Sequence, residues 1–332
     1  MDLAILKQTA AALLARNKGI LAADESAKTC AKRFEAAGMP CTKENRRLYR
    51  QLLFTTPQIE KYLSGVILFD ETIRQKSDEG ISFPQVLSRR GIIPGIKVDA
   101  GAKDLALHQE EKVTEGLDGL RERLAEYKTF GTKFAKWRAV ITIGQNIPTN
   151  ACIHANAHAL ARYAALCQEA DILPIVEPEV LIDGDHSIER SYEVTRATLE
   201  ATFSELAKQD VAYEGVILKS SMVLPGKNSN QRKTSEEIGE ATVKCLKESV
   251  PENIAGVMFL SGGQTDEQAT ANLNAINKAG GAPWRLTFSF SRAIQNPALK
   301  FWAQKNEELA RKAYVFRVRT NSLASEGKYD ES

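Results

Sequence analysis

The sequence predicts an α/β fold, a single (β/α)8 barrel with additional N- and C-terminal helices. Eight short apolar runs of strand length each stop at polar or charged residues, and helical segments separate most of these runs. Strands that alternate with helices form right-handed crossovers in a parallel sheet, and eight such strands are the number that closes a barrel.

The eight strand-like runs are spread along the whole chain. The first, residues 20–23, stops at Asp24, and the second, residues 66–69, stops at Asp70. The other six, in order, are IPGIKVD around Lys97, FAKWRAVITIG around Lys136, ILPIVEPEV around Glu177, GVILK ending on Lys219, IAGVMFLSGGQ around Ser261 and WRLTFSFSRA ending near Arg292. Their aliphatic and β-branched residues are typical of parallel strands that are buried on both faces.

Helices are expected at the N-terminus, over residues 42–55 with Thr42 as N-cap, and in five longer segments. These five segments are residues 116–133, 151–170, 186–209, 235–250 and 265–279. No linker rich in Gly, Ser or Pro divides the chain. We therefore expect residues 1–332 to form one domain, with the segment from about residue 312 to 332 extended or flexible.

The composition is that of an ordinary globular protein, with 43% hydrophobic and 26% charged residues. A formal net charge of +2 argues against a general nucleic-acid binder, although it leaves room for a local basic pocket. The five scattered cysteines form no CxxC pair, and no apolar run approaches eighteen residues. We expect a cytoplasmic protein with reduced thiols and no nucleic-acid or membrane partner.

Lys219 ends a buried strand. Burial penalises the ammonium form, so such a lysine either pairs with a carboxylate or lowers its pKa until it becomes a neutral nucleophile. For a lysine at an arbitrary strand end, an ordinary ion-paired side chain is the more common explanation. The other strand ends decide between these two interpretations.

Polar residues at the other strand ends are expected to meet Lys219, because the active site of a (β/α)8 barrel lies at the C-terminal ends of its strands. Lys136 and Arg138 are two residues apart, so they face the same side of a strand, and Glu177 and Glu179 repeat this spacing. A cluster of cations and carboxylates in a low dielectric shifts pKa values. Neighbouring cations would push Lys219 toward the neutral amine.

Taken one at a time, these residues have simpler explanations. Asp24 could cap a helix, Lys97 and Asp99 could form an ion pair at the rim, and Ser261 could belong to an ordinary turn. Seven strands, however, would have to place such groups on one face by chance. We therefore favour one site in which a lysine forms a Schiff base and carboxylates move the protons.

Two groups of residues have the chemistry of phosphate sites. Gly262 and Gly263, with Ser261 and Arg292, fit the site that barrels often build between their last two βα loops. Four residues on the opposite side could hold a second phosphate: Ser26, Thr29, Arg33 and Lys97. Two phosphates on either side of an imine-forming lysine suggest a bisphosphorylated sugar.

A set of motifs in this order resembles class I fructose-1,6-bisphosphate aldolase. The motifs are LAADES, PGIKVD, AKWR, IVEPE, GDHS, LK-x-x-M-V-x-PG, FLSGGQ and TFS-x-x-RA, with ENRRLYRQLLFT and NSLASEGKY besides. They cover nearly the whole chain, so the resemblance does not depend on any one short pattern. It implies a TIM-barrel lyase of glycolysis and gluconeogenesis that uses neither cofactor nor metal, and it suggests a homotetramer.

The resemblance implies a role for each catalytic residue. Lys219 forms the imine with the C2 ketone, and Glu177 serves as acid and base, assisted by Lys136 and Glu179. Asp24 takes the proton of the C4 hydroxyl as the C3–C4 bond breaks. The products are dihydroxyacetone phosphate and glyceraldehyde 3-phosphate.

The resemblance also implies the substrate contacts. One phosphate falls among Ser261, Gly262, Gly263, Ser289 and Arg292, and the other among Ser26, Thr29, Arg33 and Lys97, with Arg138 also binding substrate. Whether fructose 1-phosphate or sedoheptulose 1,7-bisphosphate is also cleaved well stays open, as does the physiological direction.

The chain departs from the common family pattern near the phosphates. Ser220 and Ser221 stand where many members have Pro-Asn, Ser291 replaces a usual Gly, and Lys28 and Thr29 stand where Gly-Ser is common. These substitutions bear on phosphate geometry and sugar preference.

The segment NSLASEGKY ends near the last residue of the sequence. The resemblance implies a mobile C-terminal tail that ends on a tyrosine. Tyr329 belongs to the segment before that tail, so it is not that tyrosine. We expect Glu179, Lys136 or water to reprotonate the enamine instead.

Other functions compete with this one. LSGGQ matches the signature of ABC-type ATPases, but no G-x-x-x-x-G-K-[ST] loop accompanies it. A zinc-dependent aldolase would need clustered ligands, but there are only four histidines: His108, His154, His158 and His186. His154 and His158 are four residues apart on an expected helix outside the barrel, where surface or interhelix histidines are the more common explanation. A pyridoxal-phosphate lysine or a scaffold protein that retains the fold without turnover are further alternatives.

Overall fold

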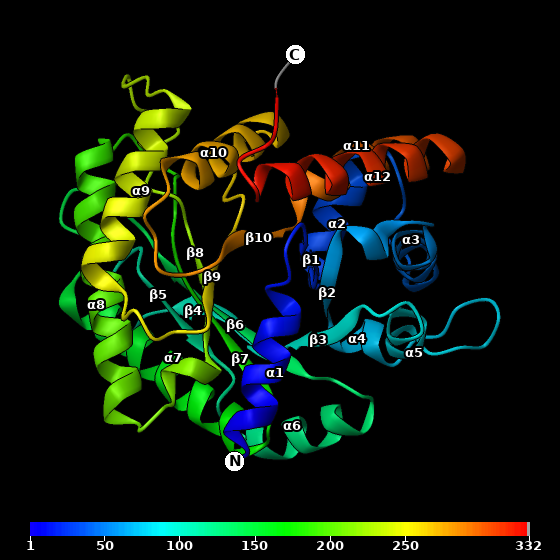
Figure 1. The fold of residues 1–332 in the computed structure, drawn as a ribbon, viewed down its shortest axis with the longest axis horizontal. Helices are drawn as coiled ribbons and strands as arrows, with labels where there is room; N and C mark the ends of the chain where they lie inside the picture. Colours follow the sequence, from blue (N-terminus) through cyan, green and yellow to red (C-terminus); the bar gives the residue numbers. More distant parts are fainter. Residues whose placement is uncertain (331–332) are drawn as a thin grey trace.

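Eight parallel strands form a closed barrel in the computed structural model, which describes residues 1–330 (Figure 1). Around the barrel the strand order is β1-β10-β9-β8-β7-β6-β3-β2. The barrel strands are β1 (Gly19–Ala23), β2 (Leu63–Leu68), β3 (Ile93–Lys97), β6 (Phe134–Ile141), β7 (Leu173–Val180), β8 (Ile217–Ser220), β9 (Gly256–Phe259) and β10 (Leu286–Phe290). The predicted barrel and its eight strands are confirmed.

Helices surround the barrel and cover its outer face (Figure 1). In chain order they are α1 (Leu3–Leu13), α2 (Ala27–Ala36), α3 (Lys43–Thr55), α4 (Asp70–Ile73), α5 (Phe83–Ser88), α6 (Leu120–Thr129), α7 (Asn150–Glu169), α8 (Ile188–Lys208), α9 (Ser235–Ser249), α10 (Asp266–Ala279), α11 (Arg292–Ala303) and α12 (Glu307–Ala324). The predicted N-cap of α3 is present, because the Thr42 side chain accepts a hydrogen bond from the Asn45 N–H. Helix α6 is shorter than the predicted segment 116–133.

The C-terminal segment differs from the sequence-based expectation. Residues 312–324 are helical rather than extended, because they belong to α12. Tyr314 and Val318 of this helix are fully buried, and the Arg317 guanidinium donates to the backbone oxygens of Ala293 and Asp266. The expectation also covered residues 331–332, which lie outside the described residues.

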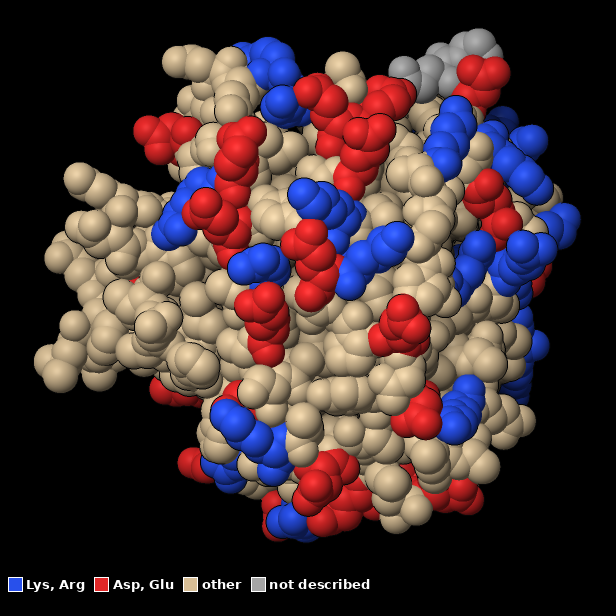
Figure 2. Space-filling view, turned by 60° about the vertical axis from the view of Figure 1, so that its left-hand side comes forward, with Lys and Arg blue, Asp and Glu red and all other residues tan. Residues whose placement is uncertain are grey.

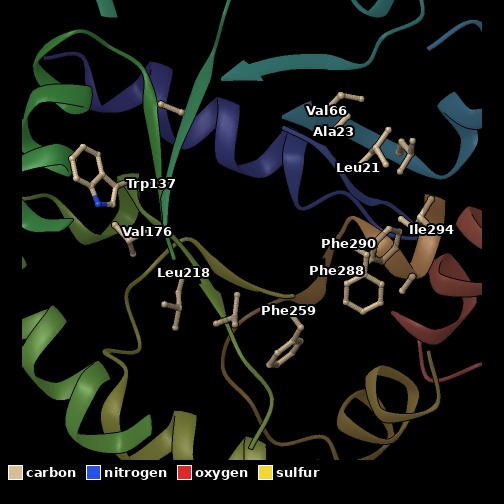
Figure 3. Close-up of a cluster of buried hydrophobic side chains, with 14 of the residues drawn as sticks. Leu21, Ala23, Val66, Trp137, Val176, Leu218, Phe259, Phe288, Phe290 and Ile294 are labelled. Carbon is tan, nitrogen blue, oxygen red and sulfur yellow. The ribbon is translucent and has the colours of Figure 1, made fainter. Parts of the chain in front are cut away.

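Side chains of the barrel strands alternate between the two faces of the sheet. Leu21, Val66, Trp137, Val176 and Leu218 point outward into a continuous apolar layer under the helices (Figure 3). On several strands the inward positions change from apolar at the N-terminal end to polar toward the cavity. On β1 they are Ile20, Ala22 and then Asp24, and on β7 they are Leu173, Ile175, Glu177 and Glu179. The barrel thus has an apolar base and a polar mouth.

Helix α1 covers the apolar base. Its residues Leu6, Ala10 and Leu13 form one buried cluster with Ile20 and Ile217 from the inside of the barrel. This contact removes the remaining apolar surface of the base from water, which favours the folded chain. The N-terminal helix therefore leaves only the opposite, C-terminal end of the barrel open.

A β-hairpin lies between β3 and α6 and was not predicted from the sequence. Its antiparallel strands are β4 (Gly101–Asp104) and β5 (Lys112–Glu115). Next to β5, the Glu111 carboxylate accepts hydrogen bonds from the backbone N–H and the hydroxyl of Thr149, at 2.6 and 2.7 Å. Thr149 caps α7, so the hairpin is anchored to the start of that helix.

The surface carries both signs of charge. Acidic and basic side chains are interspersed over the middle of the face drawn in Figure 2. Within residues 1–330, no helix combines the length and the apolar character needed to cross a membrane.

Candidate active site

A cavity of about 750 Å³ opens at the C-terminal end of the barrel. Every barrel strand contributes to its wall, through an inward-facing residue on the strand or just after it. Fourteen residues expected to bind or act on the substrate line it: Asp24, Ser26, Thr29, Arg33, Lys97, Lys136, Arg138, Glu177, Glu179, Lys219, Ser261, Gly262, Ser289 and Arg292. Gly263 does not line the cavity, but a Cβ atom there would lie 3.7 Å from the Arg292 guanidinium.

Four charged side chains form an unbroken chain across the cavity floor. Lys219 Nζ lies 2.9 Å from Glu177 Oε1, and Glu177 Oε2 lies 3.0 Å from Lys136 Nζ. The same Lys136 nitrogen lies 2.6 Å from Asp24 Oδ2. All four side chains are at most 10% exposed, so their charges interact in an environment that screens them weakly.

The charge of this chain shifts the ionisation of its members. Burial opposes ionisation of Asp24, but Lys136 and Lys219 outweigh it and lower the Asp24 pKa to about 2. The Glu177 pKa is also lowered, because Lys136 and Lys219 overcome the cost of burial. The pKa of Lys136 is raised, since Asp24 and Glu177 stabilise its ammonium against burial. Both carboxylates are therefore ionised, and Lys136 is charged, at neutral pH.

A second pair of contacts lies along β3, β6 and β7. Arg138 forms an ion pair with Glu179, and Lys97 Nζ lies 2.5 Å from Asp99 Oδ1. The other oxygen of Asp99 accepts the backbone N–H of Arg138 at 3.2 Å. The ion pair of Lys97 with Asp99, one of the simpler explanations that the sequence offers, is present, and both of its residues line the cavity.

One end of the cavity offers unpaired donors beside two left-handed glycines. Gly262 and Gly263 have φ angles of +54° and +87°, a region that glycine enters without strain. The buried hydroxyl of Ser289 and the Arg292 guanidinium have no hydrogen-bond partner within residues 1–330. Arg292 is also the first residue of α11, whose N-terminal dipole favours an anion. This end suits a phosphate group.

A second group of donors lies at the start of α2, which follows β1, the neighbour of β10 in the barrel. Ser26 caps this helix, and its Oγ lies 3.2 Å from Thr29 Oγ1. Lys97 faces the same cavity, whereas the Arg33 guanidinium is held by Glu25. An anion here would meet hydroxyl groups, cations and the positive end of a helix dipole.

Sequence reasoning missed several polar residues of this cavity, among them Glu25, Lys32, Arg123 and Tyr127. Glu25 directly follows Asp24, but its partners come from α3 and α11, far away in the chain. The strand pattern ends at residue 23 and gives no signal for such contacts. Lys32 lines the cavity because it lies one helical turn from Thr29 on α2, a spacing that could have been noticed.

The histidines lie away from the cavity. None of the four is among the residues of segment 1–330 that line it, and His158 instead contacts Glu205 at 2.9 Å. The described residues contain no group of three or more His, Cys, Asp or Glu side chains arranged to hold a metal ion.

Comparison with known proteins gives one consistent result. The family model for fructose-bisphosphate aldolase class-I, a glycolytic family, matches residues 5–332. A probable fructose-bisphosphate aldolase class 1 of Xanthomonas campestris pv. campestris is 55% identical, with 99% of each chain covered. The cytosolic fructose-bisphosphate aldolase 4 of Arabidopsis thaliana is 49% identical, with 94% of this chain and 80% of the relative covered. A solved structure of fructose-bisphosphate aldolase from Plasmodium falciparum, in complex with TRAP and a small molecule inhibitor, superposes with a TM-score of 0.97 at 46% sequence identity. The superposition covers 99% of this chain and 96% of the Plasmodium falciparum chain.

Proposed function

Because this chain belongs to the class I fructose-bisphosphate aldolase family, its activity is the reversible cleavage of fructose 1,6-bisphosphate in glycolysis, and we propose that Lys219 performs it through an imine. The observation that supports this role most directly is the chain of contacts from Lys219 through Glu177 and Lys136 to Asp24. It brings a nucleophile, two proton acceptors and a fixed cation together in one buried row.

Imine formation needs a base beside the amine. Glu177 Oε1, 2.9 Å from Lys219 Nζ, accepts a proton from the ammonium, and the free amine then adds to the C2 carbonyl of the substrate. Glu177 returns a proton to the C2 hydroxyl, which leaves as water. The product is an iminium ion on Lys219, whose positive charge can accept an electron pair.

Cleavage needs a second base near C4. Asp24 is ionised and takes the C4 hydroxyl proton, the C3–C4 bond breaks, and its electron pair moves into the iminium to form an enamine. Lys136 holds Asp24 and Glu177 in place between its two contacts. Glyceraldehyde 3-phosphate leaves, C3 is protonated, and hydrolysis of the imine releases dihydroxyacetone phosphate.

The order of the strands suggests how the substrate lies. C1 is one bond from the imine carbon, and β8 neighbours β9, which is followed by β10 in the barrel. Ser261 comes just after β9, and Ser289 lies near the end of β10. The C1 phosphate therefore belongs with Ser261, Gly262, Ser289 and Arg292, and Gly263 shapes their loop. C6 lies two carbons beyond C4, so its phosphate belongs near Asp24, with Ser26, Thr29, Arg33 and Lys97. Arg138 binds the sugar between the two ends.

Borohydride reduction tests the imine. The enzyme is incubated with fructose 1,6-bisphosphate, reduced and weighed intact, beside Lys219→Ala and a matched Lys227→Ala control. We expect a stable adduct on the native chain and on Lys227→Ala, none on Lys219→Ala, and no effect of EDTA. An adduct that persists in Lys219→Ala contradicts the assignment of the lysine, and loss of cleavage with EDTA in the absence of any adduct contradicts the imine itself.

Assembly and compartment are proposed on the family resemblance. We propose a homotetramer in the cytoplasm, in line with the cytosolic relative from Arabidopsis thaliana. Light scattering after size exclusion would then give four times the chain mass of 36.6 kDa. A monomer or dimer at micromolar concentration contradicts the tetramer without affecting the chemistry.

A further inference from the structure

Two arginines surround one carboxylate beside the cavity, where α2, α3 and α11 meet. At the centre is Glu25, whose side chain is only 7% exposed. Its carboxylate accepts hydrogen bonds from four side chains: Arg33, Arg50 (2.5 Å), Ser291 Oγ (2.7 Å) and Gln295 Nε2 (3.0 Å). Burial raises the pKa of Glu25, but Arg50 and Arg33 overcome this and lower it, so the group stays ionised. Two guanidinium groups against one carboxylate leave an excess of one positive charge.

The two arginines differ in what else they can reach. The Arg50 side chain is 4% exposed and does not line the cavity, whereas the Arg33 side chain is 14% exposed and does. If Arg33 leaves Glu25, Arg50 remains paired with the carboxylate. A buried carboxylate without a cation would be strongly destabilising, so this second partner allows Arg33 to move.

Arg33 lies on the same side of α2 as the groups assigned to the C6 phosphate. Thr29 and Arg33 are four residues apart, which is about one helical turn. The other contacts of the guanidinium, to Gln295 Oε1 at 3.5 Å and Asn296 Oδ1 at 3.3 Å, are long for hydrogen bonds. Glu25 is therefore the main competitor that a phosphate would meet for this arginine.

We propose that Glu25 is a positioning residue that competes with the C6 phosphate of the substrate for the Arg33 guanidinium. The inference rests on the proposed function of this cavity. In the free enzyme Glu25 holds Arg33 at the edge of the cavity, and a phosphate at Ser26 and Thr29 draws the guanidinium away while Arg50 keeps Glu25 neutralised. Only the fraction of molecules in which Arg33 is free of Glu25 binds the phosphate with full affinity. The apparent affinity equals the intrinsic affinity multiplied by that fraction.

Substrates with and without the C6 phosphate separate this role from a structural one. In Glu25→Gln we expect the KM for fructose 1,6-bisphosphate to fall by about threefold, because the competing charge is removed. The KM for fructose 1-phosphate, which has a hydroxyl group at C6, should stay the same. In Arg33→Ala, loss of one charge-assisted contact should raise the KM for fructose 1,6-bisphosphate by about tenfold and again spare fructose 1-phosphate.

The double variant tests whether Glu25 acts through Arg33. In the Arg33→Ala background, adding Glu25→Gln should no longer lower the KM for the bisphosphate, so the two effects are not additive. Arg47→Ala is the matched control, because Arg47 pairs with Glu44 and Asp78 on the exposed side of α3. It should leave both KM values unchanged.

Several results would overturn the proposal: an equal change of both KM values in Glu25→Gln, a rise of the bisphosphate KM in that variant, or the same threefold fall in the absence of Arg33. If Glu25→Gln does not fold, Arg33→Ala can still overturn the proposal. An equal change of the KM for both substrates, or no change of either, would mean that Arg33 does not bind the C6 phosphate. The borohydride adduct is measured in each variant. Its presence on Lys219 shows that the proposed function stands even where the competition with Glu25 fails.

Discussion

Lys136 is central to the charge balance of the buried row formed by Lys219, Glu177, Lys136 and Asp24. It contacts Asp24 and Glu177, the only two carboxylates of the row, while Lys219 contacts Glu177 alone within the described residues. Lysine and carboxylate side chains therefore alternate in a buried space, and each has a neighbour of the other kind. An unpaired ion at such a site costs several kcal/mol, so each member stabilises the ionised form of the next.

Asp24 should make stability depend on pH in a defined range. Its pKa is about 2 in the folded chain against an ordinary value of 3.8, so its stabilising contribution is complete above about pH 4 and is lost as the pH falls toward 2. We expect the wild-type protein to lose about 2 kcal/mol more unfolding free energy than Asp24→Asn between pH 5 and pH 2. Urea unfolding at a series of pH values measures this difference. Parallel pH curves for the two proteins would mean that Asp24 is not stabilised by Lys136 and Lys219.

Glu179 is the candidate for protonating the enamine at C3. It lies in the cavity wall, two residues beyond Glu177 on the same strand, and forms an ion pair with Arg138. In Glu179→Gln we expect exchange of the C3 proton of dihydroxyacetone phosphate to slow by about 100-fold, the lower range of general acid–base catalysis, while the borohydride adduct still forms. NMR of the exchange in deuterated water measures the rate. Unimpaired exchange would remove Glu179 and leave Lys136 or water.

At the scale of elements, the strands were readable because they are buried on both faces. Their apolar runs, such as residues 173–176, stop where the inward side chain becomes charged. In β7 this happens midway along the strand, which continues to Val180, so the change marks the start of the polar mouth. The two-residue spacing of Lys136 and Arg138 was enough to place both in the cavity, with Trp137 outside. The polar mouth of the barrel could therefore be derived from local sequence.

Elements that depend on distant contacts could not be derived in this way. The hairpin of β4 and β5 consists of short, largely exposed strands anchored through Glu111 to Thr149, so it has no apolar pattern of its own. C-terminal helices were predicted, but the expectation that the chain is extended or flexible from about residue 312 is wrong, because α12 continues to Ala324. Arg317 and Asn321 are polar residues on its buried side, where they bond to α10 and α11. The Glu25 cluster joins three helices and has no local signal.

The packing of β3 against β6 sets a steric limit at the base of the barrel. A Cβ atom on Gly95 would lie 2.3 Å from the ring of Phe134. We expect Gly95→Ala to reduce the unfolding free energy by about 1–3 kcal/mol, the usual cost of overpacking a core. Urea unfolding of Gly95→Ala, Phe134→Leu and the double variant measures it. The double variant should lose less than the sum of the single losses, and strict additivity would contradict a clash between these two side chains.

At the scale of the whole molecule, the terminal helices are part of the barrel's core. Helix α1 seals the base through Leu6 and Leu13, and α12 buries Tyr314 against the same apolar layer that covers the strands. The Arg285–Glu326 ion pair further connects the segment after α12 to the approach to β10. We propose on these contacts that the described chain is one domain and unfolds as one unit.

Three tryptophans can test that cooperativity, because they report on separate parts of the molecule: Trp137 on β6, Trp284 before β10 and Trp302 near the end of α11. Single-tryptophan variants should give coincident urea transitions that also match the loss of helical circular dichroism. A second measurement adds fructose 1,6-bisphosphate at about 100 times its Kd, in the Lys219→Ala background so that the ligand is not consumed. The unfolding free energy reported by each tryptophan should then rise by about 2.7 kcal/mol. A ligand effect confined to one tryptophan, or a Trp302 transition that precedes the others, would mean that α11 and α12 unfold apart from the barrel that binds the phosphates.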